Sequence, residues 1–164
     1  TKTDLQILCY AKQLVISNSK DGTYMKSKSI LQAKTQIEVQ FYDVDAMRVV
    51  WHGNYVKYLE DARCELLKKF DYNYLDMEAS GYIWPVVDMR IKYVQSAKLA
   101  KIIEVTASLV EYESRLKIEY VIRDVETDTV LTKAYTVQVA VDIQTEEMQY
   151  QSPQVLLDKL AAYI

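Results

Sequence analysis

Two acidic residues and the start of a helix stand close together in the sequence. Asp43 and Asp45 end an alternating segment, and Gly53 and Asn54 open an amphipathic segment with helical spacing. Unpaired N–H groups at a helix N-terminus carry partial positive charge and can stabilise an oxyanion. A carboxylate can attack a carbonyl carbon or remove a proton from water. Together these groups have the chemistry to hydrolyse an ester or a thioester.

Simpler roles compete with catalysis for the same residues. An aspartate in a turn usually stabilises that turn; we assign this role to Asp43, and both roles stay open for Asp45. His52 is the only histidine, and its ring either fills a structural hydrogen bond or contacts a substrate. No obvious serine or cysteine nucleophile stands beside it, so a Ser–His or Cys–His pair is not favoured.

The elements that must position these residues follow from the spacing of apolar side chains. Residues 35–42 alternate between apolar and polar, which predicts a half-buried strand. An apolar stripe at helical spacing follows, made by Tyr55, Leu59, Ala62, Leu66 and Phe70. We therefore expect one long helix over residues 54–70, with Asn54 as its N-cap. Glu60 and Arg63 are expected to pair on its surface, and the alternative is that they contact a partner subunit.

After residue 81 the spacing changes from helical to alternating. Further strands are expected over residues 84–94, 102–112, 116–125 and 130–143. One helical turn is expected around residues 74–79 and a short C-terminal helix over residues 154–163. Because short turns join successive strands, the sheet should be largely antiparallel. The pattern predicts an α+β fold in which one antiparallel sheet covers a single long helix.

The same pattern divides the chain into three segments. Residues 35–150 form the domain, residues 151–164 a short C-terminal helix, and residues 1–34 an N-terminal extension that fits the pattern poorly. Met25 opens a segment typical of a natural protein start, so we expect the first 24 residues to be artificial or mis-annotated. The alternative is a genuine N-terminal helix packed on the domain.

Composition excludes several classes of function. The 164 residues suffice for one domain, and a net charge of -3 without a basic cluster argues against nucleic-acid binding. No apolar run reaches the roughly 20 residues of a membrane helix, and no secretory signal is recognisable. The single histidine and the two cysteines, Cys9 and Cys64, provide no metal or disulfide spacing. These features predict a cytoplasmic protein without a metal site or membrane insertion.

Tyrosine is unusually frequent, with 14 copies in the chain. One explanation is an aromatic cleft that holds a ligand. The commoner explanation is that tyrosine suits half-buried strand positions.

One contiguous stretch resembles a known family. It reads Phe41-Tyr-Asp-Val-Asp-Ala-Met-Arg-Val-Val-Trp-His-Gly-Asn-Tyr55, followed by Tyr58-Leu-Glu-Asp-Ala-Arg63. This looks like the signature of the 4-hydroxybenzoyl-CoA thioesterase-like acyl-CoA thioesterases, which have the hotdog fold. The resemblance implies a curved antiparallel five-stranded sheet wrapped around one long central helix.

By position, the resemblance assigns the catalytic carboxylate to Asp45, acting as nucleophile or as general base on water. It assigns to His52 the backbone N–H that polarises the thioester carbonyl. The residues expected to contact substrate are Trp51, Asn54, Tyr55 and Leu59. The family also implies homodimers or homotetramers with sites at the subunit interface, and no metal or organic cofactor.

Arg48 departs from this resemblance, because the family usually has glycine at that position. Glycine allows close approach of the backbone. An arginine there should bring a different loop path or a new contact. The departure concerns the loop geometry and the substrate class, and it leaves the carboxylate unaffected.

The sequence thus predicts a hydrolase that cleaves acyl-CoA or acyl-carrier-protein thioesters to a free acid and a thiol. One alternative is a hotdog dehydratase acting on 3-hydroxyacyl thioesters, which would need a histidine after a His-Phe-Pro-Gly type segment together with a helix acid. The run Trp51-His-Gly-Asn54 lacks the matching proline. A second alternative is a non-catalytic acyl-thioester-binding module, which would bind without turnover.

Overall fold

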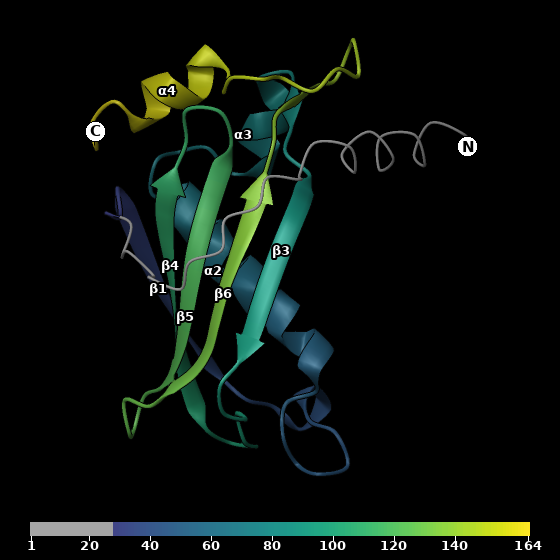
Figure 1. Ribbon diagram of the computed structural model, residues 1–164, viewed down its shortest axis with the longest axis vertical. Coiled ribbons are helices and arrows are strands. Elements are labelled where there is room, and N and C mark those ends of the chain that lie inside the picture. Colours follow the sequence, from purple (N-terminus) through teal and green to yellow (C-terminus); the bar gives the residue numbers. More distant parts are fainter. Residues whose placement is uncertain (1–27) are drawn as a thin grey trace, which may run out of the picture.

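The computed structural model describes residues 28–164 of the chain. Figure 1 shows a curved sheet that packs along one side against a single long helix. The expectation that the first 24 residues form an artificial extension or a packed helix falls on residues outside this range.

Five strands form the main sheet, in the order β1-β4-β5-β6-β3 and with every neighbouring pair antiparallel. Their bounds are Leu31–Glu38 for β1, Val86–Tyr93 for β3, Ile102–Glu111 for β4, Leu116–Asp124 for β5 and Val130–Gln138 for β6. Alternate residues of β4 and β5 are buried on one face, as period-2 side chains require. The predicted α+β fold with a five-stranded antiparallel sheet is confirmed.

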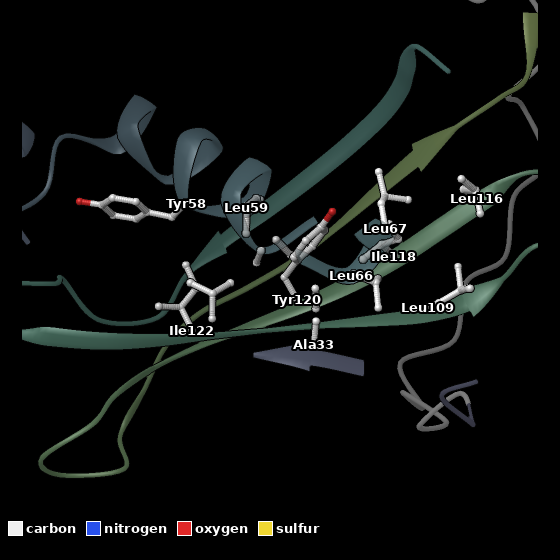
Figure 2. Close-up of a cluster of buried hydrophobic side chains, with 14 of the residues drawn as sticks. Ala33, Tyr58, Leu59, Leu66, Leu67, Leu109, Leu116, Ile118, Tyr120 and Ile122 are labelled. Carbon is white, nitrogen blue, oxygen red and sulfur yellow. The ribbon is translucent and has the colours of Figure 1, made fainter. Parts of the chain in front are cut away.

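The long helix, α2, spans Tyr55–Lys68 and lies across the concave face of the sheet. Leu59, Leu66 and Leu67 are fully buried on its sheet side, opposite Ile118 and other apolar residues of β4 and β5 (Figure 2). Burial of such a leucine side chain is worth about 1.5–3 kcal/mol. The apolar stripe read from the sequence is therefore the contact that joins helix to sheet.

Element boundaries differ from the expected ones where pairing with another strand decides them. β1 begins at Leu31, which pairs with Leu109, and it ends at Glu38 instead of running to residue 42. The expected strand over residues 130–143 is interrupted after Gln138, whose partner Val86 begins β3 directly after Pro85. Proline has no N–H to continue the ladder, so pairing stops there.

Smaller elements complete the fold. Beyond the interruption, β7 (Val141–Asp142) pairs with β2 (Tyr82–Ile83) in a separate two-stranded sheet. The helices α3 (Tyr74–Ala79) and α4 (Gln154–Leu160) lie at the end of the sheet opposite the start of α2. The turn expected around residues 74–79 is confirmed, whereas α4 ends before the expected residue 163. No helix among the described residues is long and apolar enough to cross a membrane.

The Glu60–Arg63 pair forms, but its location corrects the expectation of a surface pair. Arg63 is only 5% exposed, and its guanidinium also donates from Nε to the Tyr74 hydroxyl at 2.7 Å. A buried guanidinium needs several partners to offset its lost hydration. The Arg63–Tyr74 hydrogen bond therefore tethers α2 to α3, while the Glu60 side chain stays partly exposed.

Candidate functional site

The chain between β1 and α2, residues 39–54, is called the site loop here. It folds back on itself, because the Asp45 N–H donates to the Val49 carbonyl at 2.9 Å and the Arg48 N–H donates to the Asp45 carbonyl at 2.9 Å. Val44 and Val50 face each other in an antiparallel bridge. The Val50 N–H also donates to the Ala97 carbonyl at 2.9 Å, which fixes the loop to the segment after β3.

Asp43 organises the centre of the site loop. One carboxylate oxygen accepts the Gln40 N–H at 2.9 Å. Its backbone carbonyl accepts twice, from the Trp51 N–H at 3.0 Å and from the Asn54 side-chain amide at 2.7 Å. The side chain of Asp43 is buried, so its predicted structural role in bonding the loop backbone is confirmed.

The role of Asn54 differs from the predicted N-cap. Its side chain makes no capping hydrogen bond to α2 and is buried, with its amide N–H turned toward the Asp43 carbonyl. A capping side chain accepts a hydrogen bond, whereas this one donates. Asn54 therefore ties the helix start to the site loop.

Asp45 is the acid that the solvent can reach. One oxygen of its half-buried carboxylate accepts the Met47 N–H at 2.8 Å. The carboxylate lines an open pocket of about 530 Å³. The other residues around this pocket are Phe41, Val44, Ala46, Arg48 and Leu99. A charged group beside a mainly apolar wall suits a substrate with an apolar chain and a polar reacting bond.

The start of α2 carries the remaining predicted site residues, none of which lines the pocket beside Asp45. A 3-10 turn at His52–Asn54 runs directly into the helix. The N–H groups of His52 and Gly53 donate to no acceptor within residues 28–164, as expected for the first donors of a helical segment. A Cβ atom on Gly53 would lie 2.1 Å from the Trp51 ring, so only glycine fits beneath that ring.

The predicted site residues fall into two groups. Trp51 and His52 are exposed, with their ring centroids 4.8 Å apart at the helix start. Tyr55 and Leu59 are buried in the core of the single chain, so their predicted contact with an acyl chain stays a prediction. Sequence reasoning also missed one contact at this place: the Tyr93 hydroxyl donates to the His52 carbonyl at 2.8 Å.

Two tyrosines at the start of α2 carry raised pKa values. Burial raises the pKa of the Tyr55 hydroxyl. Burial raises the pKa of the Tyr58 hydroxyl as well, and the nearby Asp43 carboxylate raises it further. Both hydroxyls therefore keep their protons at neutral pH, and neither acts as a general base there.

The backbone at Arg48, where the family usually has glycine, has a left-handed conformation. Its φ angle is 61°, in the left-handed region that glycine adopts without cost. Its N–H bonds the Asp45 carbonyl, and its own carbonyl accepts the Leu99 N–H at 3.3 Å. The loop thus takes the backbone conformation that favours glycine, with arginine in it.

Metal chemistry has no evident ligand set in the described part of the chain. No group of three or more histidine, cysteine, aspartate or glutamate side chains within residues 28–164 is arranged to hold a metal ion.

Comparison with known proteins places the chain in a family. It belongs to the thioesterase-like superfamily, whose model matches residues 39–160. The matched range includes the site loop, α2 and every strand of the main sheet except β1. The predicted family resemblance is therefore confirmed.

Two curated relatives carry thioesterase names. The chain is 41% identical over 61 residues to the Bacillus subtilis protein named "Putative acyl-CoA thioesterase YneP", covering 37% of this chain and 44% of that one. It is 27% identical over 115 residues to the long-chain acyl-CoA thioesterase FadM of Escherichia coli, covering 70% and 86%. The match to YneP thus spans less than half of that relative.

A solved structure supports the fold assignment. The DHNA-CoA thioesterase from Staphylococcus aureus superposes with a TM-score of 0.67 at 28% identity, covering 73% of this chain and 80% of that one. The predicted hotdog fold is confirmed by this likeness together with the strand order.

Proposed function

We propose that this protein hydrolyses acyl-CoA or acyl-carrier-protein thioesters to a carboxylic acid and a thiol. The observation that supports this most directly is the site loop itself. It ends at the start of α2 in two N–H groups that have no acceptor among residues 28–164, and it carries a solvent-accessible carboxylate, Asp45, in an apolar pocket. The names of the relatives YneP and FadM, and of the Staphylococcus aureus structure, support the same class of substrate.

The reaction divides between these two parts. The thioester carbonyl oxygen accepts hydrogen bonds from the N–H groups of His52 and Gly53, whose partial positive charge stabilises the oxyanion. Asp45 either attacks the carbonyl carbon or takes a proton from the attacking water. The carbon–sulfur bond then breaks, and the thiolate leaves and takes up a proton. In the direct-attack route, water subsequently hydrolyses the acyl–aspartyl anhydride.

The test is a thiol-release assay over a panel of acyl-CoA and acyl-carrier-protein thioesters, with wild type and Asp45→Asn. Asparagine keeps the oxygen that accepts the Met47 N–H, so the loop should persist while the charge is lost. We expect kcat to fall about 100-fold or more. Asp142→Asn is the matched control, because Asp142 accepts the Gln144 N–H in the same way, two residues along the chain, in a distant turn.

Equal activity of wild type and Asp45→Asn would remove Asp45 from the mechanism. Saturable binding of panel members without hydrolysis by wild type would instead favour a non-catalytic acyl-thioester-binding module.

The active unit in this proposal is a homodimer or homotetramer. The outer edge of β3 pairs with no strand in the described part of the chain, and β3 exposes Val86, Met89 and Tyr93. The other edge strand, β1, carries charged side chains that discourage pairing. Pairing of two β3 edges across a two-fold axis would cover the apolar residues.

Light scattering tests this assembly. Wild type should have at least twice the mass of one chain, and Met89→Lys should lower it toward the monomer, whereas Gln36→Lys on β1 should not. A monomeric wild type would contradict the proposal.

A cytoplasmic location stays a prediction from the sequence.

A further inference from the structure

The N–H groups of His52 and Gly53, which find no acceptor in the described part of the chain, belong to two consecutive peptide units. In a planar trans peptide, the C=O and the following N–H point in opposite directions. A hydrogen bond to the carbonyl oxygen therefore also fixes the direction of the N–H. The directions of the His52 and Gly53 N–H groups therefore depend on the groups that bind the carbonyls of Trp51 and His52.

The two carbonyls are held by different parts of the molecule. The Trp51 carbonyl accepts the Asn54 N–H at 2.9 Å, within the same turn. The His52 carbonyl accepts the Tyr93 hydroxyl at 2.8 Å, from a residue 41 positions away at the end of β3. The direction of the His52 N–H is thus set within the turn, whereas that of the Gly53 N–H is set by the 3-10 turn together with a side chain from the edge strand. In Figure 1 the end of β3 and the start of α2 lie at the same end of the molecule.

Tyr93 is itself held in place. Its ring meets the ring of Tyr55 edge to face, with the centroids 5.1 Å apart and the planes at 79°. The Tyr55 ring is 2% exposed, and its hydroxyl accepts the Ala97 N–H at 3.1 Å. Such an aromatic pair defines where the Tyr93 hydroxyl can reach. The support for the His52 carbonyl is therefore anchored in the core of the domain.

We propose that Tyr93 is a positioning residue, whose hydroxyl holds the His52–Gly53 peptide so that the Gly53 N–H points at the thioester carbonyl oxygen. This inference rests on the proposed thioesterase function. The hydroxyl also polarises the peptide it binds, which makes the Gly53 N–H a better donor. Gly53 thereby acts as a second oxyanion donor beside His52, and the edge strand β3 takes part in catalysis without touching the substrate.

Kinetics of Tyr93→Phe test the proposal. The phenylalanine keeps the ring and its packing on Tyr55 and removes only the hydroxyl. Loss of a whole oxyanion donor costs about 100- to 1,000-fold in kcat, so loss of its support should cost about 10- to 100-fold. KM should change less than about twofold, because the lost interaction forms only in the transition state. Tyr135→Phe is the matched control. It also removes one tyrosine hydroxyl, which in β6 donates to the Asp88 carboxylate of β3 and not to the His52 carbonyl.

A second readout needs no substrate. The chain has 3 glycines, so selective ¹⁵N-glycine labelling gives at most three backbone amide signals. Variants Gly22→Ala and Gly81→Asn identify two of them and leave Gly53, where a side chain does not fit. Tyr93→Phe should shift the Gly53 signal and leave the other two in place, and Tyr135→Phe should shift none.

The outcomes separate this inference from the proposed function. An active wild type with kcat unchanged in Tyr93→Phe, or a Gly53 signal that does not move, would overturn the role of Tyr93 and leave the thioesterase proposal standing. A wild type that hydrolyses no thioester of the panel would overturn the proposed function, and with it the oxyanion role, even if the Gly53 signal responds to Tyr93.

Discussion

Leu59, Leu66 and Leu67 join α2 to the sheet through apolar contacts, whereas the site loop that precedes the helix is held by hydrogen bonds to backbone atoms. The first region tolerates small shifts at a cost in stability, because dispersion and burial are non-directional. The second depends on direction, since each donor must face its acceptor. Changes in the first region should therefore alter stability, and changes in the second should alter catalysis more than stability.

The largest expected effect on stability is in the apolar contact between α2 and the sheet. Leu66→Ala should lower the free energy of unfolding by about 2–5 kcal/mol, because a fully buried leucine leaves a cavity. Chemical denaturation measures the loss. At temperatures where the variant is folded, kcat should stay within about twofold of wild type.

Leu75→Ala is the matched control for this prediction. Leu75 lies in α3 and is 76% exposed, so its truncation should change stability by less than about 0.5 kcal/mol. A drop in kcat of Leu66→Ala as large as that of Asp45→Asn would show that the two regions are not separable.

The apolar region is also the part of the fold that the sequence predicts well. The stripe at residues 55, 59, 62 and 66 and the alternation of β4 and β5 are periodic, and burial imposes the period directly. The predicted strand boundaries are wrong where pairing with another strand determines where a strand ends. The break after Gln138 depends on Pro85, which lies more than 50 residues earlier in the chain and becomes its neighbour only through the fold.

A smaller effect on stability is expected in the site loop. Asn54→Asp keeps the size of the side chain but replaces the amide that donates to the Asp43 carbonyl with a carboxylate oxygen at about the same place. Loss of this buried bond and the new repulsion should cost about 1–3 kcal/mol. Because Asn54 fixes the start of α2, kcat should also fall, which the thiol-release assay measures.

The same substitution at Asn73 separates donor from acceptor roles. The Asn73 side chain accepts the N–H groups of Leu75 and Asp76 at the start of α3, and aspartate caps helices as well as asparagine does. Asn73→Asp should leave both stability and kcat nearly unchanged. Equal effects at the two positions would mean that the added charge, and not the lost donor, is responsible.

The site loop was only partly predictable, for a physical reason. The resemblance identifies Asp43 and Asp45 because their spacing is local. The donor role of Asn54 and the hydrogen bond from Tyr93 to His52 have no local signature. A side chain that bonds a backbone carbonyl 41 positions away places no constraint on the residue types between them. Such contacts follow from the path of the chain in space.

The smallest expected effect concerns the strained position in the same loop. Arg48→Gly should raise the free energy of unfolding by up to about 1 kcal/mol. The left-handed conformation costs a non-glycine residue about 1–2 kcal/mol, which glycine avoids. Glycine also has more conformational freedom in the unfolded chain, which offsets about 0.5–1 kcal/mol of this stabilisation. Chemical denaturation at neutral pH measures the change.

Glu146→Gly provides the comparison, because Glu146 has a φ angle of 58° in the turn after β7, away from the site loop. Both variants should gain similar stability, since both relieve the same backbone strain. Only Arg48→Gly should also change the relative kcat/KM across the substrate panel, because Arg48 lines the pocket beside Asp45. If Arg48→Gly loses stability while Glu146→Gly gains it, the arginine side chain makes a contact that outweighs its strain. The site loop would then depend on a specific side-chain contact at Arg48 as well, where the family usually has glycine.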